Sequence, residues 1–470
     1  MEDKVNELRN NMTEMITRNL TVNDCEIRIL YIPQITNRDS LSDNIIKPLL
    51  QYNGCKDITG ELLINSVIYI DDAFLDYDEN KIEDYILKGS SVIIISNCNK
   101  YIVANTVKLE KREIQSPEVE SSIRSPRDSF NEDLNSNLSL IMHRIKDSSL
   151  KIDSYTVGKK TKTTVAVIYL KDAANEKHVT EIKNKLGEIK VDGVLESGYI
   201  HKFLSDKSAT LFPQMGICER SDSACANILD GKICILVDGS NLALISPKTF
   251  IEFLDAGDDH YDNTYMGVFL KFLRVTSLII ALTLSSLYVA IVAFHTDIIP
   301  SQYILALAAS RVAVPVNAVT EAILMELILE ILREANVRLP KQIGSSIGIV
   351  GTIVIGQALV FAGLVSPLLV IIVSLSSMAS YAVPDYTFMN PIRLLKFVMI
   401  FLTGIFGLFG FVMGLSIILI KITSVTTLGV PYTAPVSPFS FKAIKNYLLS
   451  NVVSSKERPS YLGGKNKKRR

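Results

Sequence analysis

The stretch Phe272–Phe294 reads FLRVTSLIIALTLSSLYVAIVAF, and its only charged residue, Arg274, lies near its start. At ~1.5 Å per residue, a helix of this length matches the ~30 Å hydrocarbon core of a bilayer. Lipid offers no water to hydrogen-bond with backbone amides, so a spanning segment of this kind is a helix. The sequence therefore predicts a membrane protein whose first transmembrane helix is Phe272–Phe294.

Three further apolar stretches predict three further spans. They are Gln342–Leu364, Ser366–Val383 and Leu394–Ile422, the last interrupted only by Lys396 near its start. Together, the four predicted spans define a transmembrane helical domain over residues 268–423, followed by a basic tail at 424–470.

Glycine pairs spaced four residues apart occur in two of these spans. They are Gly344 with Gly348, and Gly410 with Gly414. Small residues at this spacing let helix backbones approach closely, so the pairs predict helix packing in a tight or oligomeric bundle. Ordinary lipid-compatible glycine is the alternative, and glycine rows by themselves do not identify a pore.

The segment 300–340 is apolar enough to enter a membrane, yet it is rich in charge. Its charged residues are Arg311, Glu321, Glu326, Glu330, Arg333, Glu334 and Arg338. On a helix at ~100° per residue, Glu326, Glu330 and Arg333 fall within an arc of about 60°, opposite a broad apolar face. This pattern predicts an amphipathic helix whose charged face is either solvated and paired along the helix or functional.

Glu321 breaks this pattern because it shares the apolar row with Met325. One interpretation places it in the first turn of the helix, near the capping candidates Asn317 and Thr320, where the helix dipole favours an anion. The other has it face a water-filled path or an interhelical partner such as Arg311, since ionisable residues at membrane depth are costly and commonly functional. The sequence leaves both open.

Basic residues bear on the topology without settling it. Lys271 and Arg274 place the N-terminal domain on the cytoplasmic side, and the basic end at 465–470 argues for the same side. Both ends on one side require an even number of crossings. Four spans with a re-entrant or amphipathic segment at 300–340 satisfy this, whereas a fifth span through 303–333 would not. Four spans leave Arg311, Arg333, Arg338 and Lys341 outside, whereas a fifth would bring the last three inside and place the basic tail outside. We expect four, and the sequence leaves four against five crossings open.

Residues 1–267 have a different composition, with a net charge of −11 against +3 for 268–423 and +8 for 424–470. At 48% hydrophobic and 21% charged residues the whole chain is too apolar for disorder. Strands are predicted at Glu26–Ile32, Val92–Ser96, Tyr101–Thr106, Thr164–Leu170, Ile233–Val237 and Leu242–Ser246. We expect a soluble α/β region of two small subdomains, 1–109 and 131–262, joined by a Ser-Pro-containing linker at 110–130.

The two subdomains resemble each other. The stretch EIRILYI at 26–32 is similar to TVAVIYL at 164–170, and hairpin-like patterns begin at residues 92 and 233. The offsets, 138 and 141 residues, are nearly constant, which favours an internal duplication over chance similarity between hairpins.

Patterns for catalysis are lacking. The six cysteines form no C-x-x-C pair and are expected to be reduced, buried thiols. The run Gly158-Lys159-Lys160-Thr161 lacks the upstream glycine of a phosphate loop. The five histidines are not at metal-ligand spacing. The sequence therefore predicts no enzyme, no catalytic residues, no metal and no cofactor.

Several motifs resemble one known family. The run FHTDIIPS at 294–301, then Arg311 and Pro315, and then EAILMELILEILREANVRLP at 321–340, resemble the signature of the GerA family of spore germination proteins, A-subunit type. Further similar stretches are LNSNLSLIMHRI at 134–145, LFPQ at 211–214, GKICILVDGS at 231–240 and IGIVGTIVIGQALV at 347–360.

The resemblance implies a multi-pass subunit of a germinant receptor in the inner membrane of the endospore, with the N-terminal domain and C-terminal tail on the cytoplasmic (core) side. It implies a transporter-like B subunit that senses the nutrient and a lipoprotein C subunit as partners, and no nucleic acid. It also implies that the A subunit forms a homo-oligomer that conducts ions.

Our hypothesis is that segment 300–340 lines or gates a cation path, with Glu326 or Glu321 supplying a ring of charge. The other pore or coupling candidates are Glu330, Arg333, Arg311, Pro300 and Pro315, with Pro340 also matching the family pattern. The alternatives are an assembly scaffold, or a paralogue associated with the dipicolinate-release channel, without conduction of its own. The sequence does not identify the germinant, the ion or the number of subunits.

Overall fold

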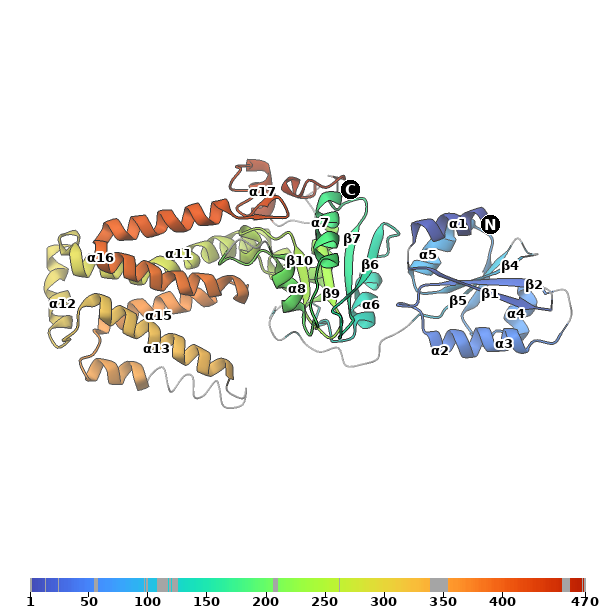
Figure 1. Ribbon diagram of the computed structural model, residues 1–470, viewed down its shortest axis with the longest axis horizontal. Helices are drawn as coiled ribbons and strands as arrows, with labels where there is room; N and C mark the ends of the chain where they lie inside the picture. Colours follow the sequence, from blue (N-terminus) through green and yellow to red (C-terminus); the bar gives the residue numbers. More distant parts are fainter. Residues whose placement is uncertain are drawn as a thin grey trace.

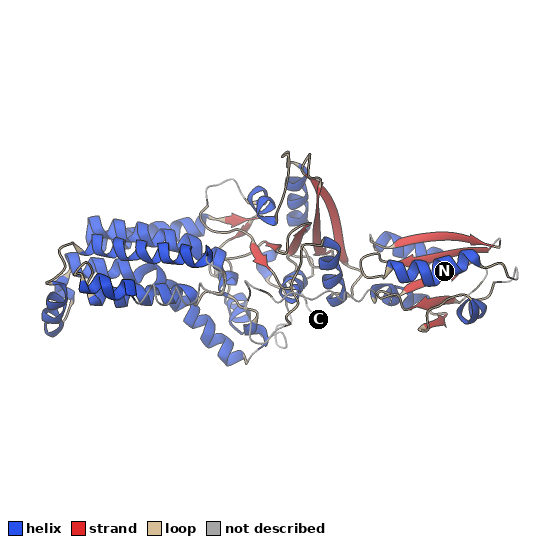
Figure 2. Ribbon diagram, turned by 90° about the horizontal axis from the view of Figure 1, so that it is seen from below, coloured by secondary structure: helices blue, strands red, loops and turns tan. Residues whose placement is uncertain are grey.

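The chain is elongated, with two β-sheet units at one end and a helical bundle at the other (Figures 1 and 2). The structure is a computed structural model. It describes the chain except for residues 1, 13, 24, 55–57, 97, 99, 108–116, 118–119, 121–125, 206–209, 262, 339–353, 450–456, 467 and 469–470.

The first unit is a five-stranded antiparallel sheet in the order β1-β2-β4-β5-β3. Its strands are β1 (Ile16–Val22), β2 (Cys25–Tyr31), β3 (Ala73–Asp76), β4 (Ser91–Ile95) and β5 (Tyr101–Ala104). The helices around it are α1 (Glu2–Asn11), α2 (Arg38–Leu41), η1 (Ser42–Ile46), α3 (Lys47–Gln51), α4 (Gly60–Ser66), η2 (Glu79–Lys81) and α5 (Ile82–Leu87). Both faces of the sheet are covered, because Ile94 packs in one core and Ile93 in the other. A strand buried on two faces is apolar throughout, as β4 is.

The second unit repeats this topology, in the order β6-β7-β9-β10-β8. Its strands are β6 (Leu150–Val157), β7 (Thr163–Leu170), β8 (Gly216–Cys218), β9 (Ile233–Val237) and β10 (Ala243–Ser246). Its helices are α6 (Leu134–Arg144), α7 (Glu176–Gly187), α8 (Ser197–Leu204) and α9 (Ser221–Leu229). When β1 is matched with β6, every strand of one sheet has a counterpart in the other, which supports the duplication.

The predicted fold class, an α/β region followed by a helical one, is confirmed, and so are all six predicted strands. The prediction missed β1, β3, β6 and β8, which form the outer positions of the two sheets. Outer strands are half exposed or very short, so their sequences lack the apolar run on which the prediction depended.

Most helices of the bundle run between the sheet end and the far end of the molecule (Figure 1). Its elements are α11 (Thr264–Phe294), α12 (Ser301–Arg311), α13 (Ala318–Arg338), α15 (Pro367–Tyr381) and α16 (Tyr386–Ser424). Among the described residues, α11 and α16 are long and apolar enough to cross a membrane. Most of the predicted span Gln342–Leu364 lies outside the described residues, although 354–361 are helical.

The predicted single span Leu394–Ile422 is wrong, because the chain reverses inside α16. Gly407 has φ 61° and ψ −140°, which no helix contains. A Cβ on Gly414 would lie 2.6 Å from the Sδ of Met399, although 15 residues of straight helix would separate them by about 22 Å. The element is therefore a hairpin of two antiparallel arms, one on each side of Gly407.

The chain after α16 returns to the second sheet unit. It passes β11 (Thr426–Thr427), β12 (Val430–Pro431) and α17 (Phe441–Leu449), and ends with η5 (Ser460–Leu462). The hydroxyl of Tyr461 donates to Glu252 at 2.8 Å, and Lys248 pairs with Asp385, the N-cap of α16, at 3.0 Å. Both ends of the bundle segment thus lie on the side of the sheets.

An aromatic cluster joins the second sheet unit to the bundle. It consists of Phe212, Phe250, Phe253, Phe388 and Tyr432, whose ring centroids lie 5.2–6.5 Å apart. Between the units, η3 (Ile251–Leu254) and α10 (Asp258–Tyr261) lead into α11, which begins where the side chain of Asn263 accepts from the amide of Tyr265 at 3.1 Å. The sheets and the helices therefore share a packed joint.

Candidate functional site

Two carboxylates of α13 lie inside the bundle, beside the buried apolar residues Ala322 and Met325. Glu321 and Glu326 are 0% and 1% exposed, whereas Leu327 and Ile331 are exposed. This is the reverse of a helix on the surface of a soluble protein, and it suits a helix surrounded by lipid. Of the two interpretations of the face formed by Glu326, Glu330 and Arg333, solvation is excluded for Glu326.

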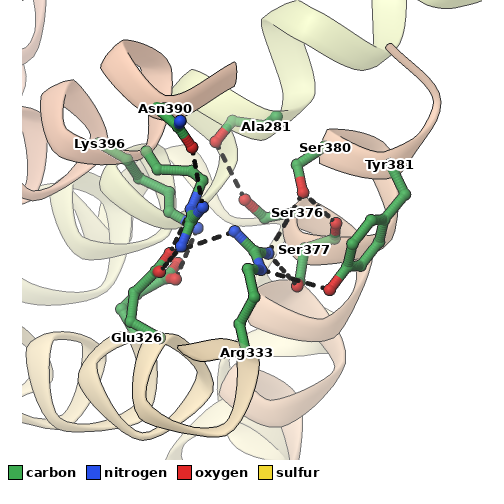
Figure 3. A network of polar contacts seen from close by, with 11 residues as sticks. Ala281, Glu326, Arg333, Ser376, Ser377, Ser380, Tyr381, Asn390 and Lys396 are labelled. Atoms are coloured by element: carbon green, nitrogen blue, oxygen red, sulfur yellow. Dashed lines mark hydrogen bonds and ion pairs between the residues drawn. The ribbon is translucent and has the colours of Figure 1, made fainter. Parts of the chain in front are cut away.

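Among the described residues of the bundle, Glu326 forms the most buried ion pair. Its Oε2 lies 2.6 Å from the Nζ of Lys396 on α16, and its Oε1 accepts from the hydroxyl of Ser285 on α11 at 2.7 Å. Figure 3 shows Lys396 reaching down from one helix toward the carboxylate on another. The ion pair thus joins α13 and α16, and α11 adds a hydrogen bond to it.

Glu330, one turn further along α13, holds two arginines. Arg393 on α16 donates to both of its oxygens, and Arg333 pairs with it at 3.2 Å. Arg333 also donates to Ser377 at 3.1 Å and to the hydroxyl of Tyr381 at 3.3 Å, and its guanidinium lies 5.1 Å from the ring centre of Tyr381 (Figure 3). The network therefore extends from α13 to α15.

Glu321 forms a separate cluster toward the far end of the bundle. Its Oε1 accepts from the amide and the hydroxyl of Ser366, both at 2.6 Å, and its Oε2 lies 3.4 Å from Arg311. Asn317 caps the helix by accepting from the amide of Thr320 at 2.8 Å. Both interpretations of Glu321 therefore hold: it sits in the first turn, and it pairs with Arg311.

The pair with Arg311 is imperfect. The Oε2 of Glu321 and the Nε of Arg311 are both buried without a hydrogen bond. Replacing Arg311 by methionine should therefore lower the free energy of unfolding by only about 1 kcal/mol, because Ser366 keeps its two hydrogen bonds to the carboxylate. Denaturant unfolding of the full chain in mixed micelles measures this. A loss as large as that of a fully paired buried charge would contradict it.

Counted together with the Glu321 cluster, the network holds more cations than carboxylates. Its carboxylates are those of Glu321, Glu326 and Glu330, and its cations are Arg311, Arg333, Arg393 and Lys396. Each carboxylate lies within ion-pair distance of a cation, so none of the three is available to a passing ion in this arrangement. A cation path through these residues requires the pairs to separate.

The other predicted positions lie apart from the network. Pro300 precedes α12 and Pro315 lies in the exposed turn between α12 and α13. Gly410 and Gly414 face the other arm of α16. Gly344, Gly348 and Pro340 lie outside the described residues.

Sequence reasoning missed the partners Lys396, Arg393, Ser285 and Ser366. The available signal was Lys396 itself, a single cation within an apolar span. Such a residue predicts a buried carboxylate on another helix, because an unpaired charge at membrane depth is costly. The sequence does not say which carboxylate.

The described part of the sheet units offers no group of side chains suited to a metal ion. Among the residues that the structure describes, no three His, Cys, Asp or Glu side chains gather in a metal-binding group. The described cysteines, Cys25, Cys98, Cys218, Cys225 and Cys234, are free thiols. Burial raises the pKa of Cys225 to about 12, which keeps this thiol protonated and unreactive at neutral pH.

Comparisons with known proteins point to one family. Residues 3–461 match the model of the family described as Bacillus/Clostridium GerA spore germination protein. The chain is 37% identical to spore germination protein GerLA of Bacillus cereus, over 92% of this chain and 89% of the relative. It is 33% identical to spore germination protein KA of Bacillus subtilis, over 93% and 81%, and 35% identical to the uncharacterized membrane protein YfkQ of the same species, over 89% and 82%.

A solved structure also matches. It is the crystal structure of the N-terminal domain of the A subunit of the Bacillus megaterium spore germinant receptor GerK3. The match has 26% sequence identity and a TM-score of 0.41, and it covers 53% of this chain and 94% of that domain.

Proposed function

This chain belongs to the GerA family of spore germination proteins, and from that premise we propose that it is the membrane-embedded A subunit of a germinant receptor. The family is one of germination proteins and not of enzymes. Its partners are then a transporter-like B subunit, which senses the nutrient, and a lipoprotein C subunit. It resides in the inner membrane of the endospore, with both ends on the cytoplasmic (core) side.

We further propose that the bundle conducts ions as a homo-oligomer when the nutrient binds. One observation carries this proposal: three carboxylates along α13 face the interior of an apolar bundle, where each is held by a cation. Ionisable groups at membrane depth are costly and commonly mark ion pathways. The paired arrangement is then the closed state, and conduction requires Glu326 to separate from Lys396.

The test uses spores that differ only at this network, placed in the nutrient medium that germinates the parent strain. Glu326→Gln should reduce the rate of ion release at least about tenfold, as expected for a charge that lines the path. The double variant Glu326→Gln/Lys396→Gln leaves the net charge of the network unchanged and should reduce ion release as much as Glu326→Gln does. The amount of the protein in the inner membrane, measured by immunoblot, must stay at the parental level. Ion release at the parental rate from the double variant would show that the carboxylate of Glu326 has no role in conduction.

Every carboxylate of the network lies within ion-pair distance of a cation, and this favours a second function, an assembly scaffold without conduction. Vesicles containing the assembled receptor distinguish the two, because a scaffold gives no ion flux with any nutrient. A role beside the dipicolinate-release channel predicts instead that the chain co-purifies with that channel and not with B and C subunits.

A further inference from the structure

Exposed aromatic side chains surround both ends of the helical bundle. Phe272, Tyr381 and Tyr386 lie at the end near the sheets, and Phe294 and Phe409 lie at the far end. Along α11, the 22 residues from Phe272 to Phe294 span about 33 Å, close to the thickness of the hydrocarbon core. Aromatic residues favour the two membrane–water interfaces. The two belts therefore place the bilayer on the bundle.

One edge of α17 is fixed at the level of the near belt. Lys271, the residue before Phe272, donates to the carbonyl of Tyr447 at 2.7 Å, and its ammonium lies 4.1 Å from the centre of the Tyr447 ring. The hydroxyl of Tyr447 donates to the carbonyl of Ile251 at 2.9 Å. Figure 1 shows α17 beside the end of α11 that faces the sheets. The helix is thus held where the bundle leaves the membrane.

The remaining surface of α17 is apolar along one stripe. Phe441 is 71% exposed and Leu448 is also exposed, and at ~100° per residue the two lie about 20° apart around the helix. Phe439, in the preceding loop, is 73% exposed. Around the helix, the exposed Lys445 borders the stripe on the side away from Tyr447. An apolar stripe edged by lysine is the pattern of a helix that lies in a membrane interface.

We propose that α17 is an interfacial anchor that binds anionic phospholipid in the near leaflet. Phe439, Phe441 and Leu448 enter the headgroup region, and Lys445 contacts the phosphate. Lys442 is less suited to this contact because it pairs with Glu457 at 2.7 Å. The net charge of +8 over residues 424–470 favours an anionic surface. This anchor does not depend on whether the bundle conducts ions.

Lipid is favoured over a protein partner by position. The Lys271–Tyr447 contact fixes α17 at the level of Phe272, a residue of the near aromatic belt. A surface at this depth lies against the lipid headgroups, so lipid is its neighbour and not a soluble protein.

The chain contains no tryptophan, so Phe441→Trp introduces a single fluorescent reporter. The full chain carrying it is placed in nanodiscs of mixed neutral and anionic phospholipid, some brominated near the headgroup. We expect blue-shifted emission that brominated lipid quenches. The control is Tyr77→Trp, at an exposed position of the first sheet unit, which should emit as in water and stay unquenched. An unchanged thermal midpoint verifies that each variant folds.

Selectivity is measured with bromine on only one lipid class at a time. Quenching should be stronger when the anionic lipid carries it, corresponding to about fivefold local enrichment for one lysine near a charged surface. The variant Phe441→Trp/Lys445→Gln should remove the difference. Equal quenching in the parent reporter would overturn the anionic preference. A water-like emission, or a blue shift without quenching, would overturn the anchor itself, the latter by showing that a second copy or another segment covers α17.

Discussion

Replacing Lys396 by methionine is expected to lower the free energy of unfolding by about 3–5 kcal/mol, because it leaves the carboxylate of Glu326 buried without its cation. The Nζ of Lys396 lies 2.6 Å from Oε2 of Glu326, and the two side chains are 5% and 1% exposed. Ser285 alone remains as a donor to the carboxylate. Denaturant unfolding of the full chain in mixed micelles, followed by circular dichroism, measures the change.

The chain offers a matched control. Lys442 pairs with Glu457 at 2.7 Å, but these side chains are 71% and 45% exposed. An exposed pair contributes little, so Lys442→Met should change the free energy by less than about 0.5 kcal/mol. The double variant Glu326→Leu/Lys396→Met removes both buried charges and should recover most of the stability lost in Lys396→Met. Equal losses for the two lysine variants would show that burial is not the cause.

The sequence predicted the central strands of both sheets but not the outer ones. Strand β9 reads ICILV and is buried throughout, so its apolar run identifies it directly. Strand β1 reads ITRNLTV and is largely exposed, so polar residues interrupt the pattern. Its counterpart β6 is also only partly buried, so the duplication could not reveal either strand from the sequence.

The charged network was predictable only as a face of one helix. The spacing of Glu326, Glu330 and Arg333 indicates that their side chains share a side of α13, because helical periodicity orders residues around an axis. It carries no information about which helices stand opposite. The pairing with Lys396 and Arg393 depends on how α16 packs against α13, and that is a property of the three-dimensional arrangement.

The sequence does not show which glycine of α16 reverses the chain. Gly404, Gly407, Gly410 and Gly414 look alike in the sequence, and each is compatible with a continuous helix. Only Gly407 adopts a positive φ. Length was the available signal, since the predicted span Leu394–Ile422 would extend about 44 Å as one helix, well beyond the ~30 Å hydrocarbon core.

Gly410→Ala should lower the free energy of unfolding by about 3 kcal/mol, by forcing apart the two arms of α16. A Cβ at Gly410 would lie 2.7 Å from the carbonyl carbon of Leu402, closer still to its carbonyl oxygen, and 2.9 Å from the Cβ of Phe406. The obstacle is backbone of the opposite arm, which moves only if the hairpin opens. Unfolding in micelles measures the loss of free energy. Less protein should also reach the membrane, and immunoblots of membrane fractions measure that amount.

Gly414 provides the contrast that isolates this cause. It stands four residues further along the same helix, but a Cβ there would meet the Sδ of Met399 at 2.6 Å and the Cδ1 of Leu402 at 3.3 Å, the far ends of flexible side chains. These can rotate away, so Gly414→Ala should change stability by less than about 1 kcal/mol. Gly356→Ala, where a Cβ would meet nothing within 4 Å, should be neutral or slightly stabilising. If Gly410 and Gly414 tolerated alanine equally, the hairpin would not be held by the approach of its backbones, and the pair would be simply a small-residue row facing lipid.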